Sequence, residues 1–179
     1  MLDHLTWGRP IWARPLKPWY TDAVTERRFP PRLNHVAMSM ARDSLDDRGR
    51  ADILTFYGEV FGWVEGDNTG EEGNPLILYT GAPAEFVYLL PSDEPLSAPH
   101  LDHFGLQVST IDELHDIVRK AKDCQGRDER VRVIDVHART THGPTRDYTL
   151  TSAYVGFVLP LMVEVQHIEH SPSLLGIAE

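Results

Sequence analysis

The chain has 179 residues, of which 41% are hydrophobic and 25% are charged, and its formal net charge is -10. This length is enough for one domain with a buried core, and the composition excludes a disordered or low-complexity chain. The negative charge argues against nucleic acid and anionic membranes as partners, because their phosphate groups would be repelled. We therefore expect a small-molecule partner.

The cysteine content and the N-terminal residues bear on the compartment. Cys124 is the single cysteine, so no disulfide can form within the chain and nothing indicates an oxidising compartment. The first residues lack the basic and apolar regions of a signal peptide, and no apolar run approaches the ~18 residues of a membrane span. A cytoplasmic location is the simplest expectation.

Residues 1–32 contain three of the four tryptophans together with five prolines. Frequent prolines exclude a helix or a central strand, and frequent large aromatics argue against a free tail. We expect an extended arm that packs on the body of the protein, contributes to a subunit contact or covers a pocket as a lid.

A regular pattern begins after this arm. Residues 33–40 alternate as in a strand, and residues 53–61 place apolar side chains at helical spacing, with Gly62 at the end. Three short strand-like runs follow, at residues 63–65, 75–79 and 85–90. The order of these elements is βαβββ.

The same order begins again after a linker at residues 91–99. Thr110 and Glu113 form a capping box at the start of a second helix, and Gly126 lies just past its end. Strand-like runs follow at residues 131–136, 148–157 and 161–168. Because His103 repeats the setting of His35 68 residues later, the chain is predicted to contain an internal duplication. The predicted domain covers residues 33–179, with module one at 33–91, module two at 100–168 and a tail at 169–179.

The last predicted strand, LMVEVQH at residues 161–167, carries one carboxylate in an apolar run. An ionised carboxylate is costly to bury without a partner, so Glu164 requires a cation or a proton donor. His35 in LNHVAM and His103 in LDHFGL each stand at the third position of an opening strand. Two imidazoles and one carboxylate are a ligand set of non-haem Fe(II) enzymes, although zinc and manganese accept similar sets. The alternatives are two hydrogen-bonded core histidines and an edge strand whose Glu faces water.

At these residues the sequence resembles the vicinal oxygen chelate superfamily, which includes glyoxalase I, fosfomycin-resistance enzymes, bleomycin-resistance proteins and type I extradiol dioxygenases. The resemblance covers residues 33–168, through LNHVAM, LDHFGL, the helix FYGEVFGW and the closing VEVQ. It implies an α+β fold in which paired βαβββ modules form a cupped mixed sheet around a metal.

Two features bear on the choice within this superfamily. Glyoxalase I uses a second Glu from the closing strand of its first module, but aligning residues 83–87 on residues 160–164 places Val87 in that position, with Glu85 two residues early. A four-ligand glyoxalase site is therefore not expected. Bleomycin-resistance proteins resemble metal-free binders, so the three retained ligand types argue against that class.

A third feature favours the dioxygenases. His142 opens the stretch HGPTR, and Tyr154 lies ten residues before Glu164. The pattern resembles the His and Tyr that precede the metal-binding Glu in extradiol dioxygenases. The distance of 22 residues from His142 to Glu164 is longer than in that family. His137 is therefore kept as the alternative to His142, and Tyr148 as the alternative to Tyr154.

The resemblance therefore implies an Fe(II)-dependent extradiol dioxygenase for a small catechol and O2, closest to single-domain L-DOPA dioxygenases. His35, His103 and Glu164 would bind the metal, with His142 as acid–base catalyst and Tyr154 as hydrogen-bond donor. The substrate-binding candidates are Arg146, whose guanidinium suits a carboxylate, and Tyr148. The alternatives are an Mn- or Zn-dependent glyoxalase or fosfomycin-resistance-type enzyme, and a metal-free binding protein. A homodimer is left open.

Overall fold

The computed structural model describes residues 32–67, 74–81, 84–142 and 147–170. The chain divides into two compact units, Met1–Leu33 and Asn34–Glu179, and every described helix and strand belongs to the second. The predicted arm therefore lies almost wholly outside the described residues, as does the predicted substrate-binding residue Arg146. No helix in the described part of the chain is long and apolar enough to cross a membrane.

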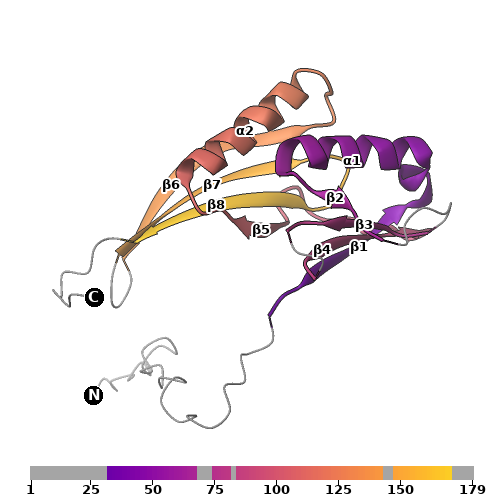
Figure 1. The fold of residues 1–179 in the computed structure, drawn as a ribbon, viewed down its shortest axis with the longest axis horizontal. Helices are drawn as coiled ribbons and strands as arrows, with labels where there is room; N and C mark the ends of the chain where they lie inside the picture. Colours follow the sequence, from indigo (N-terminus) through magenta and orange to yellow (C-terminus); the bar gives the residue numbers. More distant parts are fainter. Residues whose placement is uncertain (1–31, 68–73, 82–83, 143–146, 171–179) are drawn as a thin grey trace, which may run out of the picture. The chain divides into compact units, whose positions relative to one another are not determined.

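The first module contains four strands, one α-helix and a short 3-10 helix (Figure 1). Its elements are β1 (His35–Ala41), η2 (Arg42–Leu45), α1 (Asp47–Phe61), β2 (Val64–Glu65), β3 (Leu76–Tyr79) and β4 (Phe86–Ser92). The second module repeats this order without the 3-10 helix. Its elements are β5 (His103–Gln107), α2 (Ile111–Gln125), β6 (Arg132–His142), β7 (Asp147–Gly156) and β8 (Met162–His170). The predicted βαβββ duplication is confirmed.

Each module builds one four-stranded mixed sheet, with the orders β1-β4-β3-β2 and β5-β8-β7-β6. In both sheets the opening strand pairs in parallel with the closing strand, while the remaining pairs are antiparallel. The first and last strands of a module therefore lie side by side, although they are far apart in the sequence. This arrangement brings the predicted ligands of module two onto neighbouring strands.

The two helices begin and end where their sequences supply the caps. The side chain of Asp46 accepts a hydrogen bond from the backbone N–H of Gly49 at the start of α1, and Gly62 ends that helix in the left-handed conformation at φ 72°. Thr110 and Glu113 form the predicted capping box of α2. These interactions satisfy backbone groups that the helical hydrogen-bond pattern leaves unpaired.

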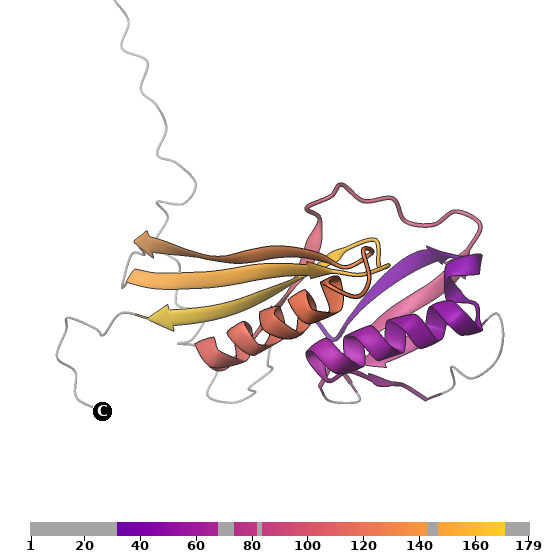
Figure 2. The same cartoon turned by 90° about the horizontal axis from the view of Figure 1, so that it is seen from above.

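Each helix packs on its own sheet, and α1 and α2 also contact each other (Figure 2). In β1 the residues Val36, Met38 and Met40 turn toward this core, while His35 and Ala37 alternate onto the exposed face. The face turned away from the helices therefore carries the polar side chains of both opening strands.

Strand β6 differs from the prediction. The apolar pattern indicated a strand that ended at residue 136, but β6 continues to His142 and pairs with β7 as far as Asp147. The additional segment is largely exposed and its side chains do not alternate between apolar and polar, so no periodic signal marks it. Its register comes from the backbone hydrogen bonds with β7.

The buried side chain of Tyr57 connects the two modules. Its hydroxyl on α1 donates a hydrogen bond of 3.0 Å to the backbone carbonyl of Phe157 in module two. Its ring stacks on that of Trp63, with the ring centres 4.8 Å apart. Burial raises the pKa of the Tyr57 phenol, so this hydroxyl stays a donor.

The Tyr57 contact predicts a stability effect. Replacement by Phe keeps the ring packing but removes one of two donors to the carbonyl of Phe157, the other being the backbone N–H of Leu159, so Tyr57→Phe is expected to lower the free energy of unfolding by about 0.5–1.5 kcal/mol. Tyr79→Phe is the control, because among the described residues that hydroxyl makes long, exposed hydrogen bonds of 3.4 Å with Asp67 and no others. Urea unfolding of both variants is the measurement. Equal stability of Tyr57→Phe and wild type would contradict this account of the module contact.

Candidate metal site on the open face of module two

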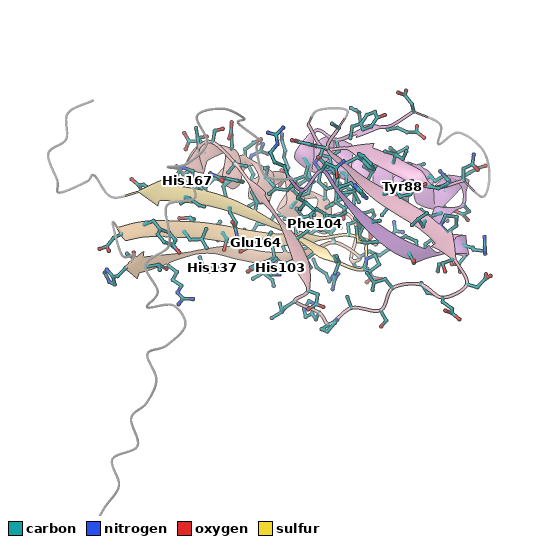
Figure 3. The ribbon with its side chains drawn as sticks, turned by 90° about the horizontal axis from the view of Figure 1, so that it is seen from below. Tyr88, His103, Phe104, His137, Glu164 and His167 are labelled. Carbon is teal, nitrogen blue, oxygen red and sulfur yellow. The ribbon has the colours of Figure 1, made fainter. Side chains whose placement is uncertain are left out.

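The candidate site forms because β5 and β8 pair in parallel. Their register places His103 opposite Met162 and Gly105 opposite Glu164. Since side chains alternate along a strand, residues 162, 164 and 166 share one face of β8. His103 and Glu164 therefore lie on the face turned away from the helices, where Figure 3 shows them close together.

The closest contact in the site joins the imidazole of His103 to the carboxylate of Glu164. Nε2 of His103 lies 3.2 Å from Oε2 of Glu164. Only 6% of Glu164 is exposed, so its carboxylate lies in an environment that penalises an unpaired charge. Oε2 also accepts a hydrogen bond of 2.6 Å from Nε2 of Gln166. The prediction that Glu164 requires a partner is confirmed, with His103 and Gln166 as two of its contacts.

Both candidate histidines engage their Nδ1 atoms in the same way. Nδ1 of His103 lies 2.7 Å from the carbonyl oxygen of Leu101, and Nδ1 of His35 lies 2.9 Å from Oδ1 of Asn34. An oxygen acceptor at Nδ1 favours a proton on that nitrogen, so Nε2 is the nitrogen at which a metal ion can take the place of a proton. This is the hydrogen-bonding pattern of metal-ligating histidines, which usually donate their other N–H to an oxygen.

His35 lies at the corresponding position of module one but does not join the pair within one chain. Its ring stacks on Phe86 with the ring centres 4.9 Å apart, and it is exposed. Within the described residues, no three His, Cys, Asp or Glu side chains come together as metal ligands. One chain therefore supplies two of the three predicted donors at one place.

Two further side chains from module two border the pair. Tyr154 lies opposite Glu164 on β7, and its ring meets that of His103 edge-on with the centres 5.0 Å apart. On the other side it stacks on His137, with the centres 5.9 Å apart. Burial and the hydrogen bond to Glu164 raise the pKa of the Tyr154 phenol. The four side chains form a continuous polar and aromatic row across the four strands of this sheet.

The orientation of His137 is set by its neighbours. Its Nε2 lies 3.2 Å from the hydroxyl of Ser152, a buried residue that faces it across the β6–β7 pairing. No pattern in the sequence marks Ser152, because a lone serine in a strand is common. Its burial becomes evident only from the hairpin register.

His142 and Tyr148 lie elsewhere. His142 ends β6, 81% of its side chain is exposed, and its Nδ1 lies 2.9 Å from Oδ2 of Asp147. Asp147 is seven residues from Tyr154 along β7, which corresponds to about 23 Å in an extended strand. Tyr148 is paired with His170 at the same end of the sheet. Of the alternatives kept in the sequence analysis, Tyr154 lies beside Glu164, and His137 lies on the other side of Tyr154.

The sequence alignment of the first module needs a correction of one residue. By strand register Tyr88 pairs with Ala37 as Glu164 pairs with Gly105, so Tyr88 and not Val87 corresponds to Glu164. Val87 points into the core and is 1% exposed. A shift of one residue moves every side chain of a strand to the opposite face of the sheet, so the alignment had assigned a core residue to the position of a ligand. The inference that module one lacks a second Glu at this position is unchanged.

A cavity of about 540 Å³ lies away from the pair, with Asp46, Arg130 and Val158 in its lining. None of the predicted ligands lines it. Arg130 already forms ion pairs with Asp52 and Asp128. The Arg130 guanidinium is therefore already neutralised by two carboxylates and is a poor candidate for binding an anionic substrate.

Similar structures identify the fold. The chain matches the fosfomycin resistance protein FosX of Listeria monocytogenes with a TM-score of 0.51 at 14% identity, covering 82% of this chain and 94% of FosX. A glyoxalase family protein of Bacillus anthracis matches with a TM-score of 0.49 at 18% identity, covering 80% of this chain and 100% of the other. Lactoylglutathione lyase of Agrobacterium tumefaciens matches with a TM-score of 0.48 at 16% identity, covering 77% and 94%.

No protein-family model and no curated protein sequence matches the chain. At these identities the structural similarity establishes the fold and not the reaction. The two mixed βαβββ sheets are the vicinal oxygen chelate fold, as predicted from the sequence.

The types of donor atom suit a divalent metal ion, but one chain does not bring all three donors together. Two imidazole nitrogens with their Nδ1 atoms committed to oxygen acceptors, and a buried carboxylate, are ligands suited to iron, manganese or zinc. His103 and Glu164 are adjacent, whereas His35 must come from elsewhere. A metal site with His35, His103 and Glu164 therefore stays a prediction.

Gly105 allows a direct test of the space beside Glu164. A methyl group on Gly105 would lie 3.8 Å from Oε2 of Glu164, an ordinary contact, whereas a larger side chain would extend over the carboxylate. Gly105→Ala is therefore expected to bind Mn(II) like wild type, and Gly105→Leu at least about tenfold more weakly. Calorimetric titration with Mn(II) is the measurement. Equal affinities for wild type and Gly105→Leu would place the metal somewhere else.

Proposed function

We propose that the chain is a divalent-metal-dependent enzyme whose substrate presents two adjacent oxygen atoms, and that it cleaves the ring of a small catechol with Fe(II) and O2. The single observation that carries the proposal is the row formed by His137, Tyr154, His103 and Glu164. It places a phenol directly beside two metal-ligand candidates and an imidazole on the other side of that phenol. The names of the similar structures add nothing specific to ring cleavage.

The residues have separable roles in this proposal. His35, His103 and Glu164 would hold Fe(II), which supplies one ion on which both catechol oxygens and O2 can meet. His137 would accept a proton from a catechol hydroxyl and return it when the ring opens, a role that an imidazole can take because its ring nitrogens can accept and donate a proton. Tyr154 would keep its proton, because its pKa is raised, and donate a hydrogen bond toward the reacting oxygens.

The second candidate is an Mn- or Zn-dependent reaction of the glyoxalase or fosfomycin-resistance kind. The same donor set accepts those ions. The names of the similar structures provide the substrates to test, and His137 could act as a general base in such a reaction without any change of oxidation state. The two candidates therefore share the site and differ in the need for O2.

An oxygen electrode distinguishes the two candidates. Protein loaded anaerobically with Fe(II) is expected to consume one O2 for each catechol, with L-DOPA, catechol and a biphenyl diol as test substrates, and to form a yellow ring-opened product. Mn(II)- and Zn(II)-loaded protein should consume none. If iron-loaded protein consumes no O2, and Mn(II)-loaded protein instead transforms fosfomycin or a glyoxalase substrate, the second candidate replaces the first.

Paired histidine variants test the assignment of His137 in the same assay. His137→Gln should lower kcat by about 10²- to 10⁴-fold with its iron content unchanged, because only proton transfer is lost. His142→Gln is the matched control at the far end of the same strand and should retain wild-type activity. The reverse result would return the acid–base role to His142.

The missing third donor leads us to propose a homodimer. His35 and His103 occupy equivalent positions on equivalent sheets, and both are exposed. In a two-fold dimer the same contact forms twice, so His35 of the partner subunit could complete each His103–Glu164 pair. Each subunit would then contribute to two sites.

Mixing two inactive variants tests this dimer. His35→Ala and Glu164→Ala should each lack iron and turnover. A mixed dimer would contain one intact site, built from His35 of the Glu164→Ala subunit and Glu164 of the His35→Ala subunit. After subunit exchange, about a quarter of wild-type activity should return on statistical grounds. If the mixture stays inactive although subunit exchange is demonstrated, His35 does not act across a dimer.

A further inference from the structure

Gln166 contacts the candidate ligand Glu164 and has no part in the roles assigned so far. It lies on β8 two residues after Glu164, on the same face, and is half-buried. Its neighbours across the sheet are Gln107 on β5 and Ser152 on β7. The side chain therefore lies next to the polar row along β8, beside the carboxylate of Glu164.

The contact is short. Nε2 of Gln166 lies 2.6 Å from Oε2 of Glu164, slightly shorter than the usual range of about 2.7–2.9 Å for a charge-assisted N–H···O hydrogen bond. The opposite orientation of the amide would set its oxygen against the carboxylate oxygen, where two acceptors repel each other. The amide therefore donates, and its orientation follows from the charge that it faces.

The other contacts of Glu164 have different properties. His103 reaches the same oxygen at 3.2 Å, but its Nε2 is the atom proposed to bind the metal and would no longer donate there. The phenol of Tyr154 is assigned to the reacting oxygens. The Gln166 amide neither titrates nor ligates strongly, so it can hold Oε2 whether or not metal is bound.

The β-sheet itself does not need the Gln166 side chain. Strand β8 is fixed on both sides by backbone pairing with β5 and β7. Gln107, its register partner on β5, is exposed and makes no side-chain hydrogen bond with any described residue. The two glutamines are thus alike in residue type and strand position, and they differ in the contact with Glu164.

We propose that Gln166 is a positioning residue that orients the carboxylate of Glu164 toward the metal. This inference rests on the proposed metal site. Hydrogen bonds to a metal-ligating side chain fix its orientation, and their removal typically costs about 10- to 100-fold in metal affinity. Gln166 would act in this way from within the same strand as the ligand.

The test uses Co(II) as the probe and the full chain. Gln166→Met removes the donor at nearly constant length, and Gln107→Met is the matched control. Gln166→Met is expected to raise the Kd for Co(II) by about 10- to 100-fold and to shift the visible Co(II) absorption bands, which report ligand geometry. Gln107→Met should leave both unchanged. Gln166→Asn, whose amide is too short to reach Oε2, should reproduce the loss if the Met variant does not fold.

A change within about threefold in Kd for both Gln166 variants, with unchanged bands, would overturn the inference. Equal losses of Co(II) affinity in Gln166→Met and Gln107→Met would also overturn it, because the loss would then not depend on the hydrogen bond between Gln166 and Glu164. Absence of Co(II) binding in the wild-type chain would instead refute the proposed metal site itself. These outcomes separate the role of Gln166 from the proposed function.

Discussion

The parallel pairing of β5 with β8 is the constraint on which the candidate site depends. It joins the first and last strands of module two, so an imidazole and a carboxylate 61 residues apart in the sequence come within 3.2 Å. The pairing also places Gly105, which has no side chain, beside the carboxylate. A slip of one residue would turn Glu164 into the apolar core, where no polar partner is available.

Much of the fold follows from local signals in the sequence. The helix ends are encoded by Asp46, Gly62 and the Thr110 capping box, and the alternation of β1 separates its core side from its exposed side. The extension of β6 to His142 was not predictable, because an exposed segment of an edge strand has no apolar periodicity. Such a segment is specified by its neighbour and not by its own composition.

The site was predictable to the extent that it depends on strand periodicity. Duplication and alternation were enough to bring His103 and Glu164 together, since they lie on the paired first and last strands of the module. The choice between His137 and His142 depended on the β6–β7 register, which includes an irregularity between Ile134 and His137 that spacing alone cannot reveal. The assignment of Val87 in place of Tyr88 has the same origin. The sequence alignment matched Pro83 to Pro160, whereas the true correspondence follows from the hydrogen-bonded strand partners.

In the proposed metal site, one chain would supply an incomplete but preorganised set of donors. Glu164 is buried and oriented before any ligand arrives, and Gln166, Tyr154 and His103 surround its oxygens. Such preorganisation lowers the cost of gathering ligands around an ion. His35 carries the corresponding Nδ1 contact in module one, which makes it the natural third donor from a second copy.

The most direct measurement is an anomalous-difference map from crystals of the protein grown with Mn(II). The account predicts one strong peak per site, within about 2.0–2.3 Å of Nε2 of His103 and of a carboxylate oxygen of Glu164. A peak bound by neither residue, or His103 and Glu164 still in direct contact in fully metal-loaded crystals, would contradict it.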